Sequence, residues 1–176
     1  MERPVPDYQA VGPVNRGSRP TVSTFQANRK LTFLYTNAQS ILANLDKLKI
    51  NVCELSPDII SVTENWLSQH VDDREVTMTG YQIFRKDRKE RQGGGVLTYV
   101  KSELTVLDKT YKLASTSEAI WLSVKVSGTS SLDVLTVYRP PRRDPVADAN
   151  LQEELEKFAT RFDIQIMGDF NAPHID

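Results

Sequence analysis

The pattern of hydrophobic and polar residues becomes regular at Leu31. Residues 31–35 form a short apolar run with aromatic content, which predicts a buried strand that ends at Asn37. The next apolar residues recur at steps of three and four behind Ser40, a suitable N-cap, and the pattern stops at Pro57. The sequence therefore predicts an amphipathic helix between Ser40 and Pro57.

A second apolar run over residues 58–63 predicts another buried strand. Glu64 stands where this strand ends, as Asn37 does at the end of the first strand. The chain thus opens with the order strand, helix, strand, which is typical of α/β layers. We therefore expect Glu64 and Asn37 at the same edge of a sheet.

The rest of the chain predicts shorter strands and one more helix. The even-numbered residues of 120–126 are apolar, so one face of that strand is expected to meet a core. Apolar residues from Leu151 to Phe162 signal the helix, and residues 163–167 form a last strand before Gly168-Asp-Phe-Asn171. Regular spacing favours antiparallel meanders for the middle strands, which are expected at 81–85, 96–100, 104–107, 119–126 and 132–138.

Composition narrows the class of protein. The chain has 176 residues, enough for one domain and a tail, and its 39% hydrophobic and 26% charged residues are typical of a soluble globular protein. No uncharged apolar run approaches the roughly 18 residues of a membrane span, so we expect no membrane partner. The net charge of −1 excludes a uniformly basic, histone-like binder. The single Cys53 excludes an intramolecular disulfide and a multi-thiolate zinc site.

Residues 1–30 differ from the rest of the sequence. They contain four of the nine prolines and lack apolar periodicity, which predicts a disordered, basic leader ahead of a folded part over residues 31–176. No apolar stretch follows the first residues as it would in a secretory signal peptide. The sequence therefore predicts an intracellular protein without a signal peptide.

Polar residues suited to phosphate chemistry stand at the ends of four predicted strands. A single acid or amide after a strand is most often a turn residue or a helix cap, and a single tyrosine is more often a packed edge aromatic. The Gly168-Asp-Phe-Asn171 segment is equally compatible with a tight turn. The residues concerned are Asn37, Glu64, Tyr138 and the pair Asp169 and Asn171.

Taken together and in this order, these motifs resemble the endonuclease/exonuclease/phosphatase superfamily. The residues within these motifs are most similar to those of the apurinic-type endonuclease domain of non-LTR retrotransposon polyproteins. The resemblance covers residues 31–176 and implies an α/β fold, a four-layer sandwich of two mixed β-sheets flanked by helices. The motifs that carry it are Tyr35-Thr-Asn-Ala-Gln-Ser40, Val62-Thr-Glu-Asn-Trp-Leu67, Gly93-Gly-Gly-Val96, Val137-Tyr-Arg-Pro-Pro141 and Met167-Gly-Asp-Phe-Asn-Ala-Pro-His174.

The resemblance implies metal-assisted hydrolysis of a phosphodiester with Mg²⁺ (or Mn²⁺) and no small-molecule cofactor. Such an ion prefers oxygen ligands and few carboxylates. Glu64 is then the metal ligand, with an amide oxygen of Asn37 beside it. Asp169 would position or deprotonate the attacking water, and Asn171 and Tyr138 would donate hydrogen bonds to phosphate oxygens.

One part of the family pattern has no counterpart in this sequence. The catalytic His of that family belongs to a Ser-Asp-His-type block well downstream of Gly168-Asp-Phe-Asn171, and the sequence ends at Asp176. Neither His70, expected in an exposed loop, nor His174 matches it. The expectation is therefore a domain that is incomplete at its C-terminus and weakly active or inactive.

Two basic segments are candidate phosphate contacts. The run Arg85–Arg91, which includes Arg88, has five cations and two acids and suits either a solvated hairpin face or a flexible DNA-binding loop with Gly93–Gly95 as its turn. Arg139 and the neighbouring Arg142 and Arg143 form the second. No motif for reading bases is visible, and oligomeric state is not indicated.

Three functions follow as alternatives. The favoured one is a DNA-nicking endonuclease of a mobile element, with DNA as partner and, by family resemblance, the nucleus as location. The second is a catalytically inactive remnant that keeps the motifs. The third is a superfamily phosphatase or phosphodiesterase with the same metal site. The similarity of the motif residues to the retrotransposon domains argues against this third function.

Overall fold

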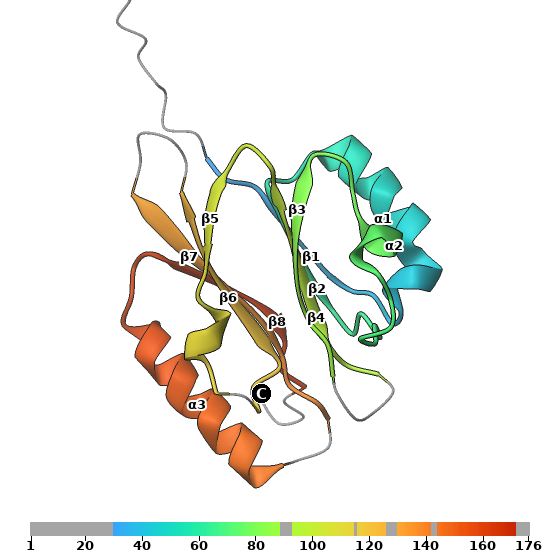
Figure 1. Ribbon diagram of the computed structural model, residues 1–176. Coiled ribbons are helices and arrows are strands. Elements are labelled where there is room, and N and C mark those ends of the chain that lie inside the picture. The colour runs from blue at the N-terminus through green and yellow to red at the C-terminus, as the bar shows by residue number, and fades with distance from the viewer. Residues whose placement is uncertain (1–29, 89–92, 115, 126–129, 142–143, 172–176) are drawn as a thin grey trace, which may run out of the picture.

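Two mixed β-sheets pack face to face with helices on their outer sides (Figure 1). The computed structural model describes residues 30–88, 93–114, 116–125, 130–141 and 144–171. The predicted leader, apart from its last residue, and His174 lie outside these residues. The predicted four-layer α/β sandwich is confirmed over the described part of the chain.

The first sheet has the order β1-β2-β4-β3. Its first two strands are parallel, and both other pairings are antiparallel. The β3–β4 pair agrees with the antiparallel pairing expected from the spacing of the short strands, whereas β2 and β4 are not consecutive along the chain. The strands are β1 (Phe33–Asn37), β2 (Ile59–Thr63), β3 (Tyr81–Lys86) and β4 (Val96–Lys101).

The second sheet has the order β5-β6-β7-β8 and is built in the same way. β5, β6 and β7 form an antiparallel meander, and β7 and β8 are parallel. Each sheet therefore contains one parallel pair. The strands are β5 (Thr105–Asp108), β6 (Ala119–Lys125), β7 (Ser131–Tyr138) and β8 (Ile164–Asp169).

Helix α1 (Ile41–Leu55) covers the outer face of the first sheet as predicted. The Ser40 hydroxyl accepts from the Ala43 N–H at 3.4 Å, which satisfies one free donor of the first turn. The helix ends at Ser56, which adopts a left-handed conformation before Pro57. The short α2 (Asp73–Val76), which the sequence analysis left in a polar stretch, is held by a capping box between Asp72 and Glu75.

Helix α3 (Pro145–Ala159) covers the second sheet and corrects the predicted span. It starts before the expected Leu151 because the Asp144 carboxylate accepts from the N–H groups of the first turn and Pro145 suits the first helical position. It also ends earlier, so Phe162 lies beyond the helix and is fully exposed. A capping signal here outweighs the apolar spacing.

The apolar side chains form a core between the sheets and one under each set of helices. On β6 the even-numbered residues Ile120, Leu122 and Val124 face the other sheet, as predicted. Trp121 lies on the opposite face and meets the Phe158 ring of α3 edge to face, with centroids 4.9 Å apart. The outward side of β6 is thus also covered.

A chain of three buried hydroxyls links the sheets. Thr136 of β7 bonds to Ser61 of β2 at 2.8 Å and to Thr98 of β4 at 2.9 Å, and all three side chains are fully buried. Ser61 and Thr98 are direct partners in the first sheet, so one hydroxyl of the second sheet serves both. Because buried polar groups must be paired, this link fixes how one sheet lies on the other.

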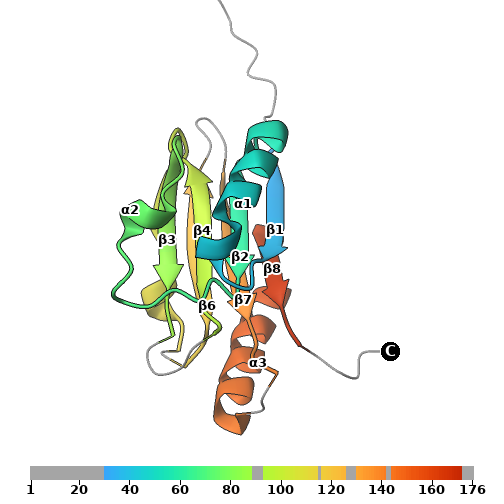
Figure 2. The ribbon, with the colours of Figure 1, turned by 90° about the vertical axis from the view of Figure 1, so that its right-hand side faces the viewer.

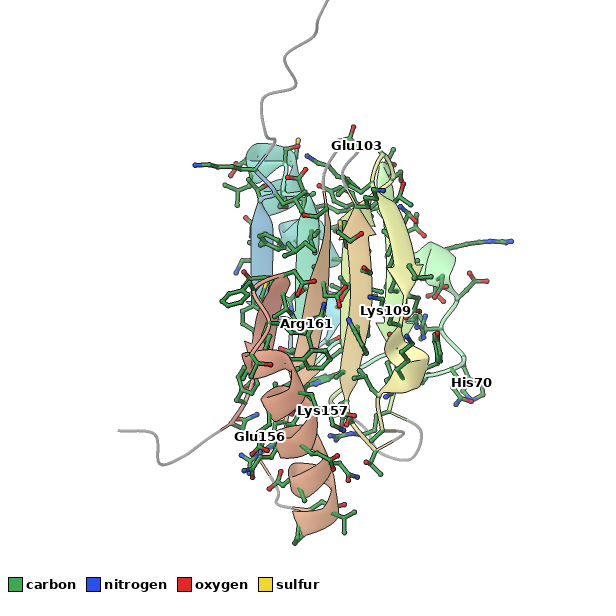
Figure 3. The ribbon with its side chains drawn as sticks, turned by 90° about the vertical axis from the view of Figure 1, so that its left-hand side faces the viewer. His70, Glu103, Lys109, Glu156, Lys157 and Arg161 are labelled. Carbon is green, nitrogen blue, oxygen red and sulfur yellow. The ribbon has the colours of Figure 1, made fainter. Side chains whose placement is uncertain are left out.

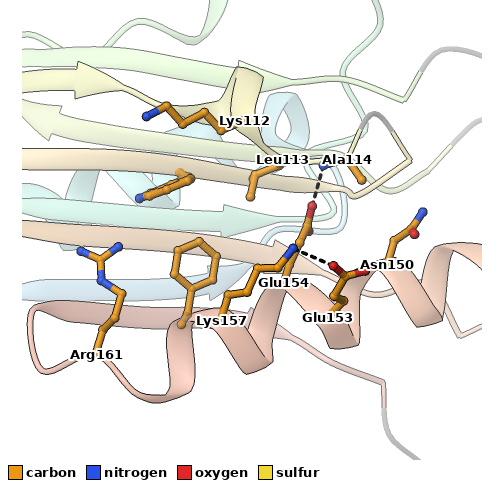
Figure 4. A pocket seen from close by; sticks show the side chains of 10 residues that line it. Lys112, Leu113, Ala114, Asn150, Glu153, Glu154, Lys157 and Arg161 are labelled. Atoms are coloured by element: carbon orange, nitrogen blue, oxygen red, sulfur yellow. Dashed lines mark hydrogen bonds and ion pairs between the residues drawn. The ribbon is translucent and has the colours of Figure 1, made fainter.

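A cleft of about 330 Å³ lies between α3 and the short 3₁₀ helix η1 (Thr110–Lys112) on the outer face of the second sheet (Figure 4). Lys109, Lys157 and Arg161 lie on this side of the molecule (Figure 3). Each of them has an acidic partner, since Lys109 and Arg161 both pair with Asp133 and Lys157 pairs with Glu153. No helix in the described part of the chain is long and apolar enough to cross a membrane.

Candidate active site at the meeting point of the two sheets

The carboxyl ends of β1, β2, β7 and β8 point to the same end of the molecule (Figure 2). Asn37, Tyr138 and Asp169 are the last residues of β1, β7 and β8, and Glu64 directly follows β2. The expectation that Glu64 and Asn37 share one sheet edge is confirmed. Each sheet contributes one half of the cluster.

The Asn37 amide joins the two halves. Its Nδ2 donates to Glu64 Oε1 and to Asp169 Oδ2, both at 3.1 Å. Two neighbouring carboxylates repel each other, and amide hydrogens placed between them reduce that repulsion. The Asn37 oxygen, which the resemblance assigned to a metal, accepts from the Gln39 N–H at 3.3 Å. An amide oxygen has two lone pairs, so this bond leaves it able to ligate an ion as well.

Glu64 is held in an unusual backbone conformation. Its φ angle is +51°, while its carbonyl accepts from the Ser40 N–H at 3.0 Å. Such left-handed conformations are unfavourable for residues other than glycine and gather at functional sites. Five of the six described non-glycine residues with positive φ lie in the loops after β1, β2 and β8, namely Gln39, Ser40, Glu64, Trp66 and Asn171.

The loop after β8 is braced against the loop after β7. Asn171 donates its backbone N–H to Asp169 Oδ1 at 3.1 Å and its side-chain Nδ2 to the Arg139 carbonyl at 2.8 Å. The Arg139 N–H in turn donates to the Asp169 carbonyl at 2.8 Å. Asp169 and Asn171 are therefore positioned by a closed set of hydrogen bonds.

The Arg139 side chain supports this loop from within the protein. It forms two 2.8 Å hydrogen bonds to Asp148 of α3 and donates to the carbonyls of Phe170 and Asn171. These bonds use most of its five donors. The structure thus places Arg139, expected as a phosphate contact, in a bracing role.

Tyr138 is almost completely buried in the core between the sheets. Burial raises the pKa of its phenol to about 12, the carboxylates of Glu64, Glu118 and Asp169 add to the rise, and Arg88 opposes it. The phenol consequently keeps its proton throughout the physiological range. It can act as a donor toward an anion.

Arg88 lies beside Tyr138, with its guanidinium 5.9 Å from the ring centroid. Its Nε donates to Glu118 Oε1 at 2.8 Å, and Nη2 contacts the same oxygen. Glu118 also accepts from the Gly95 N–H at 3.0 Å through Oε2. Glu118 was not expected from the sequence, because a single acid before an alternating strand has no distinguishing pattern.

The rest of the basic run is only partly within the described residues, which stop at Arg88 and resume at Gly93. Arg85 pairs with Asp73 at 2.8 Å and with Asp87. Lys86 donates to a backbone carbonyl. The described cations of this run are therefore engaged inside the protein.

The glycine turn packs closely on the loop after β2. Gly94 and Gly95 accept from the backbone N–H groups of Trp66 and Asn65 at 3.1 and 3.4 Å. A Cβ on Gly95 would lie 2.5 Å from the Asn65 side-chain oxygen, and its φ is +81°. The expected close turn is confirmed, and glycine is required there.

The potential metal ligands at the site are oxygen atoms. Glu64 and Asp169 are half-buried carboxylates that meet across an amide, while the described residues contain no cluster of three or more His, Cys, Asp or Glu side chains suited to a metal. Mg²⁺ is commonly held by one or two carboxylates and several waters. The residues present fit that ion.

No protein-family model matches the chain, and no curated protein does. Solved structures do match. The endonuclease domain of TRAS1, a telomere-specific non-LTR retrotransposon, aligns with a TM-score of 0.62 and 14% identity over 82% of this chain and 61% of that one. The 3′ phosphatase NExo from Neisseria, bound to a product DNA hairpin, aligns with a TM-score of 0.60 and 17% identity over 84% and 60%.

An AP endonuclease from Archaeoglobus fulgidus aligns with a TM-score of 0.55 and 19% identity over 81% of this chain and 58% of that one. The chain thus spans about three-fifths of the length of these structures. These likenesses show that the chain shares the fold of these three structures.

Proposed function

We propose that the chain carries the catalytic centre of a metal-dependent, DNA-nicking endonuclease of the non-LTR retrotransposon kind. The observation that carries this proposal is the meeting of Glu64 and Asp169 across the Asn37 amide at the strand ends of both sheets. The likeness to the TRAS1 endonuclease domain and to NExo bound to product DNA supports a nucleic-acid substrate. DNA is accordingly the proposed partner.

Glu64 and the amide oxygen of Asn37 would hold Mg²⁺ or Mn²⁺. The bound ion supplies a Lewis acid beside the scissile phosphate. Asp169 would orient the attacking water and accept its proton, with the Asn171 N–H fixing one carboxylate oxygen. The water oxygen would bond to phosphorus while the bond to the 3′ oxygen breaks. The phosphate then stays on the 5′ end at the nick, and the leaving 3′ oxygen takes a proton from solvent water to become a 3′ hydroxyl.

Two neutral donors would stabilise the negative charge that grows on the phosphate oxygens. The Tyr138 phenol stays protonated because its pKa is raised to about 12. The Asn171 side chain keeps one N–H beyond the one it gives to the Arg139 carbonyl. Fixed donors in a partly buried site act mainly in the transition state.

The experiment compares Glu64→Gln and Asp169→Asn with Glu156→Gln, an exposed acid of α3. Mn²⁺ binding is measured by electron paramagnetic resonance, which does not depend on turnover. We expect Glu64→Gln to weaken Mn²⁺ binding at least about tenfold. Even the mutation of a residue that only supports a metal ligand lowers metal affinity by about that factor. Glu156→Gln should bind as the native chain does.

Nicking of supercoiled plasmid in Mg²⁺ is the second measurement. It uses each variant in a chain extended at its C-terminus by a Ser-Asp-His-type block, because weak or no activity is expected without that block. Both site variants should lose the Mg²⁺-dependent conversion to open circles, and Glu156→Gln should keep it. Unchanged Mn²⁺ affinity in Glu64→Gln would contradict the proposed metal site. Unchanged nicking in Asp169→Asn would contradict the proposed role in water activation.

A further inference from the structure

Trp66 is exposed although the chain around it is buried. Its exposed fraction is 44%, while the neighbouring Asn65 and Leu67 are at 1% and 5%. A tryptophan side chain has one of the largest apolar surfaces of any residue, and leaving it in water forfeits that contribution to folding. The loop after β2 nevertheless presents it beside the candidate active site.

The indole is held in place rather than left free. Trp66 has a φ of +55°, and its backbone N–H donates to the Gly94 carbonyl at 3.1 Å. Its indole Nε1 donates to Glu64 Oε2 at 3.3 Å. A Cβ on Gly93 would lie 3.7 Å from that nitrogen, so the glycine turn packs against the polar edge of the ring.

These contacts give the ring a defined position next to the proposed metal ligand. Trp66 anchors to the carboxylate oxygen of Glu64 that Asn37 does not contact. Strained backbone kept at a site indicates that the surrounding structure selects that conformation. An aromatic ring with its polar edge fixed and much of its surface in water is suited to stacking on a planar ligand.

We propose that Trp66 forms a base-stacking subsite, which takes an unpaired base of single-stranded DNA next to the phosphate at the Glu64–Asp169 cluster. The inference rests on the proposed function for the phosphate. A nucleobase is the planar group that a nucleic acid carries beside each phosphate. Stacking on an aromatic side chain tolerates every base, so no base-reading motif is needed.

Intrinsic fluorescence tests the subsite without turnover. The chain has two tryptophans, so in Trp121→Phe the tryptophan emission comes from Trp66 alone. This variant is titrated in EDTA with an oligothymidylate of about ten nucleotides, within the usual range of single-strand site sizes. We expect the emission to be quenched. An abasic deoxyribose-phosphate chain of the same length should bind more weakly and leave the emission nearly unchanged.

Variants of Trp66 separate stacking from the contact with Glu64. Trp66→Leu should weaken oligothymidylate binding by roughly 5- to 150-fold, the usual worth of one stacked base. Trp66→Phe keeps an aromatic face and loses the indole N–H, so it should recover most of the affinity. Tyr111→Leu, which removes a 79% exposed aromatic ring from η1, is the matched control and should not change binding.

Two results would overturn the subsite. One is equal quenching and affinity for the abasic chain, a comparison that uses no Trp66 variant and survives a folding defect in Trp66→Leu. The other is native affinity in a folded Trp66→Leu. Failure of the proposed function would be a separate result. Unchanged Mn²⁺ affinity in Glu64→Gln would reject the metal site, whereas quenching that depends on the bases would still support the stacking subsite.

Discussion

The Asn37 amide lies between carboxylates from different sheets, and this position makes it sensitive to charge. Asn37→Asp would place a third carboxylate beside Glu64 and Asp169, where two N–H bonds now reduce their repulsion. We expect a loss of about 0.5–1 kcal/mol in the free energy of unfolding in EDTA, modest because the site is open to solvent. Mg²⁺ should restore more stability to this variant than to the native chain.

Thermal unfolding with and without Mg²⁺ measures the effect. Asn51→Asp on the exposed side of α1 adds the same charge away from the cluster and serves as the control. It should show neither the loss in EDTA nor the added response to Mg²⁺. Equal behaviour of the two variants would mean that the carboxylates do not interact through Asn37.

The Tyr138 phenol links the site to alkaline pH. Its pKa is about 12 in the folded protein against 10.0 ordinarily, so its protonated form favours folding. That contribution is complete below pH 10 and is lost as the pH rises from 10 to about 12. The Tyr138→Phe variant should lack one phenol that titrates near pH 12 in ultraviolet difference spectra. In urea, where the native chain is unfolded, its Tyr138 phenol should titrate near 10.

Among the elements, the glycine turn before β4 depends most on a single residue type. Gly95 and Gly80 have nearly equal φ angles, +81° and +85°, but only a Cβ on Gly95 would meet the Asn65 side chain. Gly80→Ala should therefore cost only the left-handed backbone conformation, about 1–2 kcal/mol. Gly95→Ala should cost at least about 1 kcal/mol more, because the contact forces atoms to shift.

Urea unfolding of the two alanine variants separates these terms. Their difference isolates the contact with Asn65, since the backbone term is common to both. Equal losses would show that the Asn65 side chain yields freely. The emission of Trp66 in a Trp121→Phe background should also change in Gly95→Ala and not in Gly80→Ala, because the turn packs on the loop that holds the indole.

Elements with strong local signals could be predicted from the sequence. β1, α1 and β2 follow from two apolar runs and one helical period, and the strand ends that carry Asn37 and Glu64 follow from them. The start of α3 was misplaced because the Asp144 cap and Pro145 outweigh apolar spacing. Tyr138, Asp169 and Asn171 were assigned to the site because their motifs resemble those of the family.

Features that depend on contacts between distant segments had no local signal. Glu118 accepts hydrogen bonds from the Arg88 side chain and the Gly95 N–H, and both donors lie next to strands of the other sheet. Arg139 braces a loop because Asp148 lies within reach on α3, which spacing along the chain does not reveal. The direction of the Asn37 amide likewise depends on a carboxylate 132 positions away.

For the whole molecule, the hydroxyl link between the sheets is the most specific internal contact. Thr136→Val keeps the shape of the side chain but leaves Ser61 and Thr98 without their partner. We expect a loss of about 1–3 kcal/mol in the free energy of unfolding, the cost of unpaired buried groups. Replacing all three hydroxyls, as Ser61→Ala, Thr98→Val and Thr136→Val together, should cost less than the single change.

Denaturant unfolding measures both variants, and Thr105→Val on the exposed part of β5 is the control for the substitution itself. A triple variant less stable than Thr136→Val alone would mean that the hydroxyls contribute net stability. Thr136 is two residues from Tyr138 in β7, so the single variant should also shift the halves of the site relative to each other. Weaker Mn²⁺ binding would report that shift.

The span of 132 positions between Asn37 and Asp169 also has a consequence for the order of folding. Glu64 is only 27 positions from Asn37 and can meet it once β1, α1 and β2 have formed. Closing the longer loop loses more chain entropy and is therefore slower. During refolding, the first sheet would present its acid and amide early, and the complete cluster would appear only when β8 docks. Arrival of the second carboxylate would then mark the last step toward the native state.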